Sequence, residues 1–177
     1  ATVEPRQAVV GREVVYGSRP VEEARRGGRR VRRVWTSDDL SAPELTRLAG
    51  SPDHQGVVAE VDPYPYADPN ALLGPPDALV VALDQVTDPH NLGAVCRSAE
   101  AAGASGVVIP ERRSATVTAA VAKASAGAVE HLAVARVPNL ADWLAQAKDA
   151  GAWIYGAEAD ADTPYTKACL LYTSPSP

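Results

Sequence analysis

The sequence predicts an α/β protein with a small N-terminal α/β unit followed by a larger unit built on a parallel sheet. Three observations support this fold class. After residue 77, apolar runs typical of buried strands alternate with amphipathic helical segments. Five prolines interrupt residues 62–77, and proline is excluded from helix interiors. The 177 residues are 46% hydrophobic, which is enough for one good core or for one core and a smaller second one.

The N-terminal unit is expected over residues 1–61, before a proline-rich linker at 62–77. Residues 20–26 and 42–49 have helical patterns, and residues 31–36 and 56–61 are typical of strands. The charge of the chain also changes near this boundary. Residues 1–61 hold ten Arg against nine Asp and Glu, whereas residues 62–177 hold seven basic and thirteen acidic residues. The two parts are therefore expected to differ in role or partner.

An arginine cluster lies in the stretch RRGGRRVRR, residues 25–33. Guanidinium groups bind phosphates in a two-pronged way and stay charged at any working pH. The cluster is therefore suited to contact with an RNA or DNA backbone. The alternative is a solvated surface with no ligand. The candidate RNA-binding residues are Arg25, Arg26, Arg29, Arg30, Arg32 and Arg33.

The second unit alternates strands and helices with regular lengths. Strands are expected at 78–84, 106–110, 131–137 and 152–158, with helices at 91–103, 116–128 and 139–151 between them. This order implies parallel strands, right-handed crossovers and helices on both faces of the sheet. Ligands of such sheets bind beyond the carboxyl ends of the strands.

The first helix of this unit carries the candidate catalytic residues. Asn91 is expected to cap it, and Arg97 lies off its apolar stripe. Helical side chains point toward the N-terminus, so Arg97 should lean over Gly93 and Ala94 and reach an anion site at the helix start. Alternatively, Arg97 pairs with Glu100 on the surface and Gly93 only allows close packing. The stripe consists of Leu92, Val95, Cys96, Ala99 and Ala102.

Several other classes of protein fit the sequence poorly. His90 and His131 have no partner at metal-ligand spacing, and two cysteines are too few for a four-ligand zinc site, so no metal is assigned. No apolar run is long enough to cross a membrane, and no signal peptide is visible, so a cytoplasmic location is expected. The G-x-G-x-x-G pattern of nicotinamide-binding proteins is missing after the first strand of the second unit.

Two segments carry a resemblance to a known family. LDQVTDPHNLGAVCRSAEAAGASGVVIPERRSA and KASAGAVEHLAVARVPNL resemble the SpoU (TrmH-type) RNA ribose 2'-O-methyltransferases, whose first motif surrounds Asn91, Gly93 and Arg97. Upstream, VVYGSRPVEEARRGGRRVRRV and HQGVVAEV are similar to the substrate-binding domain of the ribosomal RNA guanosine branch.

The resemblance implies S-adenosylmethionine as methyl donor and a ribose 2'-hydroxyl as acceptor, in a guanosine of large-subunit ribosomal RNA. It also implies a homodimer and a trefoil-knotted SPOUT-type catalytic domain, of which residues 78–168 would be the N-terminal part. Arg97 would hold a phosphate and stabilise the developing alkoxide, and Asn91 would orient either Arg97 or the ribose. Gly156 and Ala157, at the end of the last expected strand, would contact the cofactor.

The sequence departs from the family after Lys167. The second and third family motifs do not follow, and residues 169–177 form a non-family tail. We therefore expect a C-terminally truncated fragment that binds S-adenosylmethionine weakly or not at all. A non-catalytic RNA-binding module remains the alternative, because the arginine cluster is present while the cofactor motifs are missing.

Overall fold

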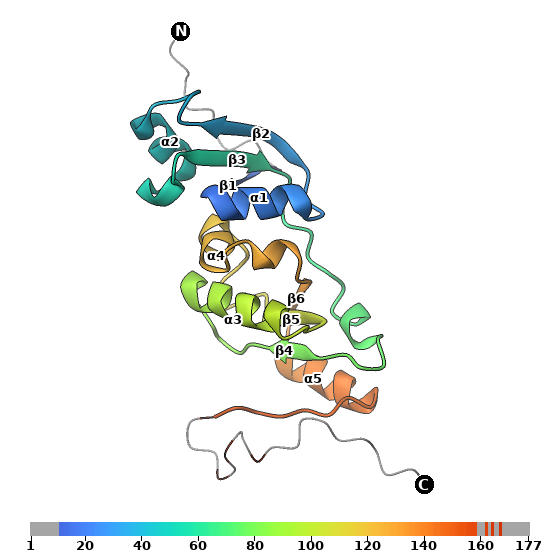
Figure 1. Cartoon of the computed structure of the whole chain (residues 1–177). Helices are drawn as coiled ribbons and strands as arrows, with labels where there is room; N and C mark the ends of the chain where they lie inside the picture. Colours follow the sequence, from blue (N-terminus) through green and yellow to red (C-terminus); the bar gives the residue numbers. More distant parts are fainter. Residues whose placement is uncertain (1–10, 159–161, 163, 165–166, 168–177) are drawn as a thin grey trace.

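The computed structural model describes residues 11–158, Asp162, Pro164 and Lys167, and it contains two separate sheets (Figure 1). The first unit consists of β1 (Glu13–Tyr16), α1 (Ser18–Arg26), β2 (Val31–Thr36), α2 (Ala42–Ala49), η1 (Pro52–His54) and β3 (Val57–Val61). The second consists of η2 (Ala71–Leu73), β4 (Val80–Ala82), α3 (Pro89–Ala101), β5 (Gly106–Pro110), α4 (Ala119–Ala124), η3 (Ala128–Glu130), β6 (Val134–Val137) and α5 (Leu140–Asp149).

The first sheet is antiparallel, with strand order β1-β3-β2. Val15 and Ala59 are paired across β1 and β3 and pack on the side of α1, whereas the next pair, Tyr16 and Val58, packs with Leu45 of α2. Successive strand residues point to opposite faces, so both faces of this sheet are covered. β1 was not predicted, because a four-residue strand is too short to show an alternating pattern.

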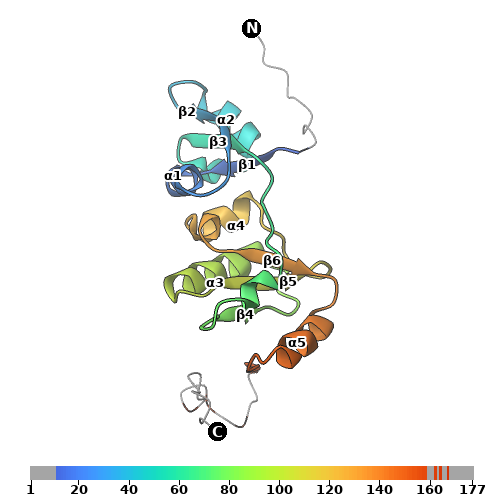
Figure 2. The same cartoon turned by 90° about the vertical axis from the view of Figure 1, so that its right-hand side faces the viewer.

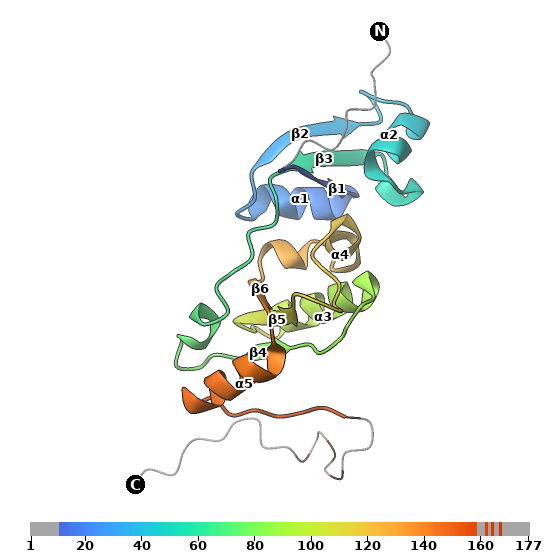
Figure 3. The same cartoon turned by 180° about the vertical axis from the view of Figure 1, so that it is seen from behind.

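The second sheet is parallel, with strand order β4-β5-β6. α3 and α4 cover one of its faces, and α5 covers the other (Figure 3). Cys96 of α3 is buried in this core, and burial raises the pKa of its thiol to about 11. The parallel sheet with helices on both faces confirms the predicted fold class.

The strand predicted at residues 152–158 was wrong. This segment is not part of any strand of the described sheets, and Trp153, Ile154 and Tyr155 are exposed. A strand requires backbone hydrogen bonds to a neighbour. The apolar pattern indicates only that the residues favour a strand, and it does not indicate whether a neighbouring strand is present.

The two units share one core, and α1 lies against α4 (Figure 2). Val21 and Ala24 of α1 belong to the same buried cluster as Val121 and Val129 of the second unit. The connecting segment is also fixed, because the buried Tyr64 hydroxyl donates hydrogen bonds to two carbonyl oxygens of the second unit, at 3.0 and 2.8 Å. The first unit is therefore held in one orientation.

Candidate functional site

Asp88, and not Asn91, caps the start of α3. The Asp88 side chain accepts a hydrogen bond from the backbone N–H of His90 at 2.9 Å, and Pro89 occupies the first helical position. Proline suits this position because the first N–H groups of a helix have no partner inside it. The predicted cap was wrong by one turn, and Asn91 is an exposed residue of the first helical turn.

Gly93 serves helix packing. A Cβ atom at this position would lie 2.5 Å from the Cβ of Ala124 and 3.0 Å from the backbone oxygen of Val121. Gly93 is buried and lets α3 approach α4 closely. The prediction that Gly93 clears space for Arg97 was therefore wrong, and the alternative of close packing is the one that the structure shows.

Arg97 is exposed and opens the third turn of α3. It lies about 12 Å along the axis from Pro89, farther from the helix start than expected, because α3 begins before Asn91. Within the described residues, its side chain has no hydrogen bond or ion pair, either to Asn91 or to Glu100. The side chain is thus available to a ligand, and the structure does not join it to Asn91.

Three residues of the arginine cluster are engaged by acidic side chains. Arg26 pairs with Glu22 at 2.5 Å on the surface of α1, and Arg32 pairs with Asp62. Arg33 stacks on the ring of Trp35, with 4.9 Å from its Cζ atom to the ring centroid. Only Arg25 and Arg30 of the cluster have neither an acidic nor an aromatic partner in the described part of the chain.

Arg29, the third engaged residue, is buried between the two units. It forms ion pairs with Glu13 of the first unit at 2.9 Å and with Glu130 of the second at 3.2 Å, and it lies 5.6 Å from the ring centroid of Tyr64. The Glu130 side chain is 0% exposed, and burial raises its pKa against the opposing effect of Arg29. We therefore leave Arg29 out of any RNA-binding surface.

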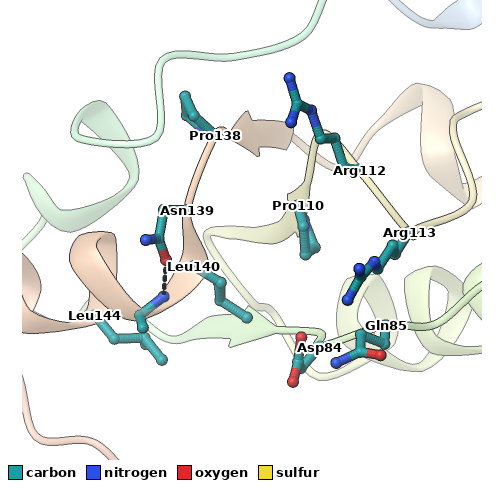
Figure 4. A pocket seen from close by; sticks show the side chains of 10 residues that line it. Asp84, Gln85, Pro110, Arg112, Arg113, Pro138, Asn139, Leu140 and Leu144 are labelled. Carbon is teal, nitrogen blue, oxygen red and sulfur yellow. Dashed lines mark hydrogen bonds between the residues drawn. The ribbon is translucent and has the colours of Figure 1, made fainter.

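A cleft of about 400 Å³ opens at the carboxyl ends of the parallel strands (Figure 4). Asp84 and Gln85 follow β4, Arg112 and Arg113 follow β5, and Asn139 follows β6 and caps α5. The cleft lies at the edge of the sheet where the sequence predicts ligand binding, but none of the predicted site residues lines it. The two adjacent arginines, Arg112 and Arg113, that follow the apolar run GVVIP after Glu111 were the signal that could have identified its basic wall.

Other polar residues of the sequence have structural contacts. The buried His54 accepts the N–H of Gly56 at Nδ1, 3.0 Å away, and thus stabilises the turn before β3. The hydroxyl of Ser125 is buried and donates to the carbonyl of Ala122. Gly156 and Ala157 are exposed, outside the sheet, and line neither this cleft nor a second one beside α3.

The described residues contain no group of three or more His, Cys, Asp or Glu side chains that could hold a metal ion. None of the helices in the described ranges is both long and apolar enough to span a bilayer.

Comparisons with known proteins agree with this architecture. The model of the SpoU rRNA Methylase family matches residues 78–174, and this match extends past Ala168, where we expected the resemblance to end. A TrmH family tRNA/rRNA methyltransferase of Staphylococcus haemolyticus is 37% identical, over 86% of this chain and 72% of the relative. A relative with the same family name from Staphylococcus aureus is 48% identical, over 69% of this chain and 51% of the relative.

Among solved structures, the SpoU methyltransferase AviRb from Streptomyces viridochromogenes, in complex with the cofactor AdoMet, is similar with a TM-score of 0.60 and 28% identity. The similarity covers 80% of this chain and 62% of AviRb, so the chain spans less than two thirds of that structure. The matched family model covers more than half of the residues, including the whole parallel sheet. The chain belongs to the SpoU rRNA methylase family.

Proposed function

We propose that this chain belongs to an RNA methyltransferase that transfers a methyl group from S-adenosylmethionine to a ribose 2'-hydroxyl, in a guanosine of large-subunit ribosomal RNA. The observation that carries this proposal is an exposed Arg97 that has no partner among the described residues. It lies on the helix that follows the first parallel strand, within the Asn91-Gly93-Arg97 motif. Family membership, the tRNA/rRNA methyltransferase names of the relatives and the AdoMet complex of AviRb support it. We further propose that the whole enzyme is a cytoplasmic homodimer.

Arg97 would act on the acceptor side of the reaction. Methyl transfer requires a ribose oxygen aligned with the donor, and negative charge develops on that oxygen as its proton leaves. A guanidinium, with a pKa above about 12, is a poor base but a strong donor of two parallel hydrogen bonds. Arg97 would therefore bind the neighbouring phosphate and stabilise the alkoxide. Asn91, one and a half turns earlier, would contact the ribose and not Arg97.

The RNA would also contact the first unit. Arg25 and Arg30 are exposed and have no acidic partner in the described part of the chain, and Arg33 presents its guanidinium over Trp35. Each such cation adds a contribution to phosphate binding that weakens with salt. Because Arg29 fixes the first unit on the second, an RNA strand bound there would keep one position relative to Arg97.

The described residues do not form the pocket that the cofactor would need. Gly156 and Ala157 were the candidates for cofactor contact, yet both are exposed and neither belongs to a sheet or to either cleft. We therefore assign only the binding and activation of the RNA acceptor to this chain and derive no step through the cofactor.

A nucleoside analysis tests the proposal. The whole enzyme to which this chain belongs is incubated with S-adenosylmethionine labelled in the methyl group and with ribosomal RNA, and the RNA is then digested to nucleosides. The label is expected in 2'-O-methylguanosine. Label in a base-methylated nucleoside would refute ribose chemistry, and label in another 2'-O-methylnucleoside would refute guanosine as the acceptor.

A non-catalytic RNA-binding module is the second candidate, favoured by the exposed position of Gly156 and Ala157. Separate titrations with RNA and with S-adenosylmethionine distinguish the two. A module binds RNA and leaves the cofactor unbound, whereas a chain that forms a cofactor site binds both.

A further inference from the structure

We propose that the cleft at the carboxyl ends of β4, β5 and β6 binds the phosphodiester backbone of the RNA, with Arg113 as its main contact. The proposal rests on RNA being the substrate, as proposed above. It concerns residues outside the Asn91-Gly93-Arg97 motif, on the loop that follows β5. The RNA strand would then be held at two places, at Arg97 and at the cleft on the carboxyl edge of the parallel sheet.

The charge of the cleft favours an anion. Arg112 and Arg113 are exposed, and neither has an ion pair or a hydrogen bond within the described residues. Among the described residues, Asp84 is the one acidic side chain that lines the cleft, so this part of the lining carries two positive charges against one negative charge. Figure 4 shows the Arg113 side chain directed toward Asp84 and Gln85, while that of Arg112 extends away from them.

The backbone of the cleft is unusual on both sides. Gln85, on the loop after β4, has a φ of 53°, and Arg113, on the loop after β5, has a φ of 58°. Residues other than glycine rarely adopt this left-handed conformation, because the Cβ atom is crowded by the backbone. Both loops therefore keep a side chain where glycine would be the less strained choice, and both side chains line the same cleft.

The start of α5 adds donors to the same wall. Asn139 accepts hydrogen bonds from the N–H groups of Ala141 and Asp142 through its Oδ1 atom, at 3.0 and 3.4 Å. Its own NH2 group has no acceptor within the described residues and can donate to a ligand. Asn139, Leu140 and Ala141 all line the cleft. The positive end of a ten-residue helix thus faces the space into which Arg113 points.

These features suit a nucleic acid strand better than a single small anion. The cleft is open to the surface, and its two guanidinium groups are directed to different places. Each of the two guanidinium groups can bind one of two successive phosphates of the same strand, and the forked guanidinium matches phosphate geometry. A single carboxylate, such as that of S-adenosylmethionine, would engage one fork and leave the other unused.

The experiment measures RNA affinity by fluorescence anisotropy with a labelled single-stranded RNA of twelve nucleotides, at several NaCl concentrations. Arg113→Gln is compared with the wild-type chain and with Lys148→Gln. Lys148 is an exposed cation near the other end of α5, so its replacement removes the same charge outside the cleft. Thermal unfolding of each variant checks that it is folded.

We expect Arg113→Gln to bind RNA about tenfold more weakly and to reduce the slope of log K against log salt by about one, because one phosphate contact is lost. Lys148→Gln should stay within about twofold of the wild type, as expected for a cation without a phosphate contact. Equal affinity and slope for the two variants would overturn the proposal. So would an Arg113→Gln protein that loses affinity for S-adenosylmethionine and not for RNA, since the anion would then be the cofactor carboxylate.

The outcomes separate this proposal from the proposed function. If the wild type methylates ribose and Arg113→Gln binds RNA as tightly as the wild type, only the proposed role of the cleft is rejected. A base-methylated product, together with weakened binding by Arg113→Gln, rejects the ribose chemistry and retains the cleft.

Discussion

Replacing Arg29 with methionine tests how the two units are held together. Methionine keeps much of the length of the side chain but removes the charge that faces Glu13 at 2.9 Å and Glu130 at 3.2 Å. Because the Glu130 side chain is 0% exposed, the variant leaves an uncompensated buried carboxylate. Removing one partner of a buried ion pair costs about 3–5 kcal/mol of unfolding free energy.

The loss should depend on pH. Burial raises the pKa of Glu130 above its ordinary value of 4.5, and Arg29 opposes this increase. A carboxyl group whose pKa is raised on folding binds its proton more tightly in the folded state, so stability falls as pH rises from the unfolded-state pKa through the folded-state value. Without Arg29 the pKa of Glu130 rises further. Arg29→Met should therefore be more destabilising at pH 7 than at pH 5.

Urea unfolding at pH 5 and pH 7, followed by circular dichroism, measures both effects. Arg32→Met is the matched control, because Arg32 pairs with Asp62 while its side chain is 39% exposed, and such pairs contribute at most about 1 kcal/mol. A loss below about 1 kcal/mol for Arg29→Met that is the same at both pH values would refute the reasoning that the pair is desolvated.

Two further predictions concern packing and RNA contact. Gly93→Ala should lower the unfolding free energy by about 1–2 kcal/mol, because the cost of overpacking against Ala124 exceeds the gain of about 1 kcal/mol in helix propensity. Thermal unfolding measures this loss. A variant more stable than the wild type would contradict the prediction. The double variant Arg25→Gln, Arg30→Gln should weaken RNA binding and reduce its salt slope by about two in an anisotropy titration. An unchanged slope would show that these exposed arginines belong to a solvated surface.

The sequence predicted most of the fold, because its elements have strong local signals. The boundaries of α2, β2 and β5 agree with the predicted ranges, since turn residues and apolar runs delimit them. The helix predicted at 116–128 is shorter in the structure: Ala119–Ala124 is followed by the left-handed Ala126 and Gly127 and then by η3. Such a change of direction depends on packing against α1, which no local pattern encodes.

The edge of the sheet at which the cleft lies could be predicted from the sequence, but the residues that line the cleft could not. The carboxyl edge of the parallel sheet follows from the order of strands and helices alone. The partners of an arginine cannot be predicted in this way, because they depend on contacts between residues that are distant in the sequence. Arg29 contacts Glu130 across about a hundred positions of sequence. For the same reason, local spacing could not distinguish a glycine that packs against α4 from one that makes room for Arg97.

The rate of methyl transfer by an Arg97→Lys variant of the whole enzyme tests the central claim most directly. Lysine keeps the charge but loses the two-pronged geometry, so single-turnover transfer to RNA should fall by about a hundredfold or more, as for the loss of a donor to a developing oxyanion. RNA affinity should change little, because lysine keeps the positive charge that binds phosphate. The unfolding temperature should also change little, because Arg97 is exposed and unpaired in the described part of the chain. Transfer by this variant at the wild-type rate would contradict the assignment of Arg97 to the reacting ribose.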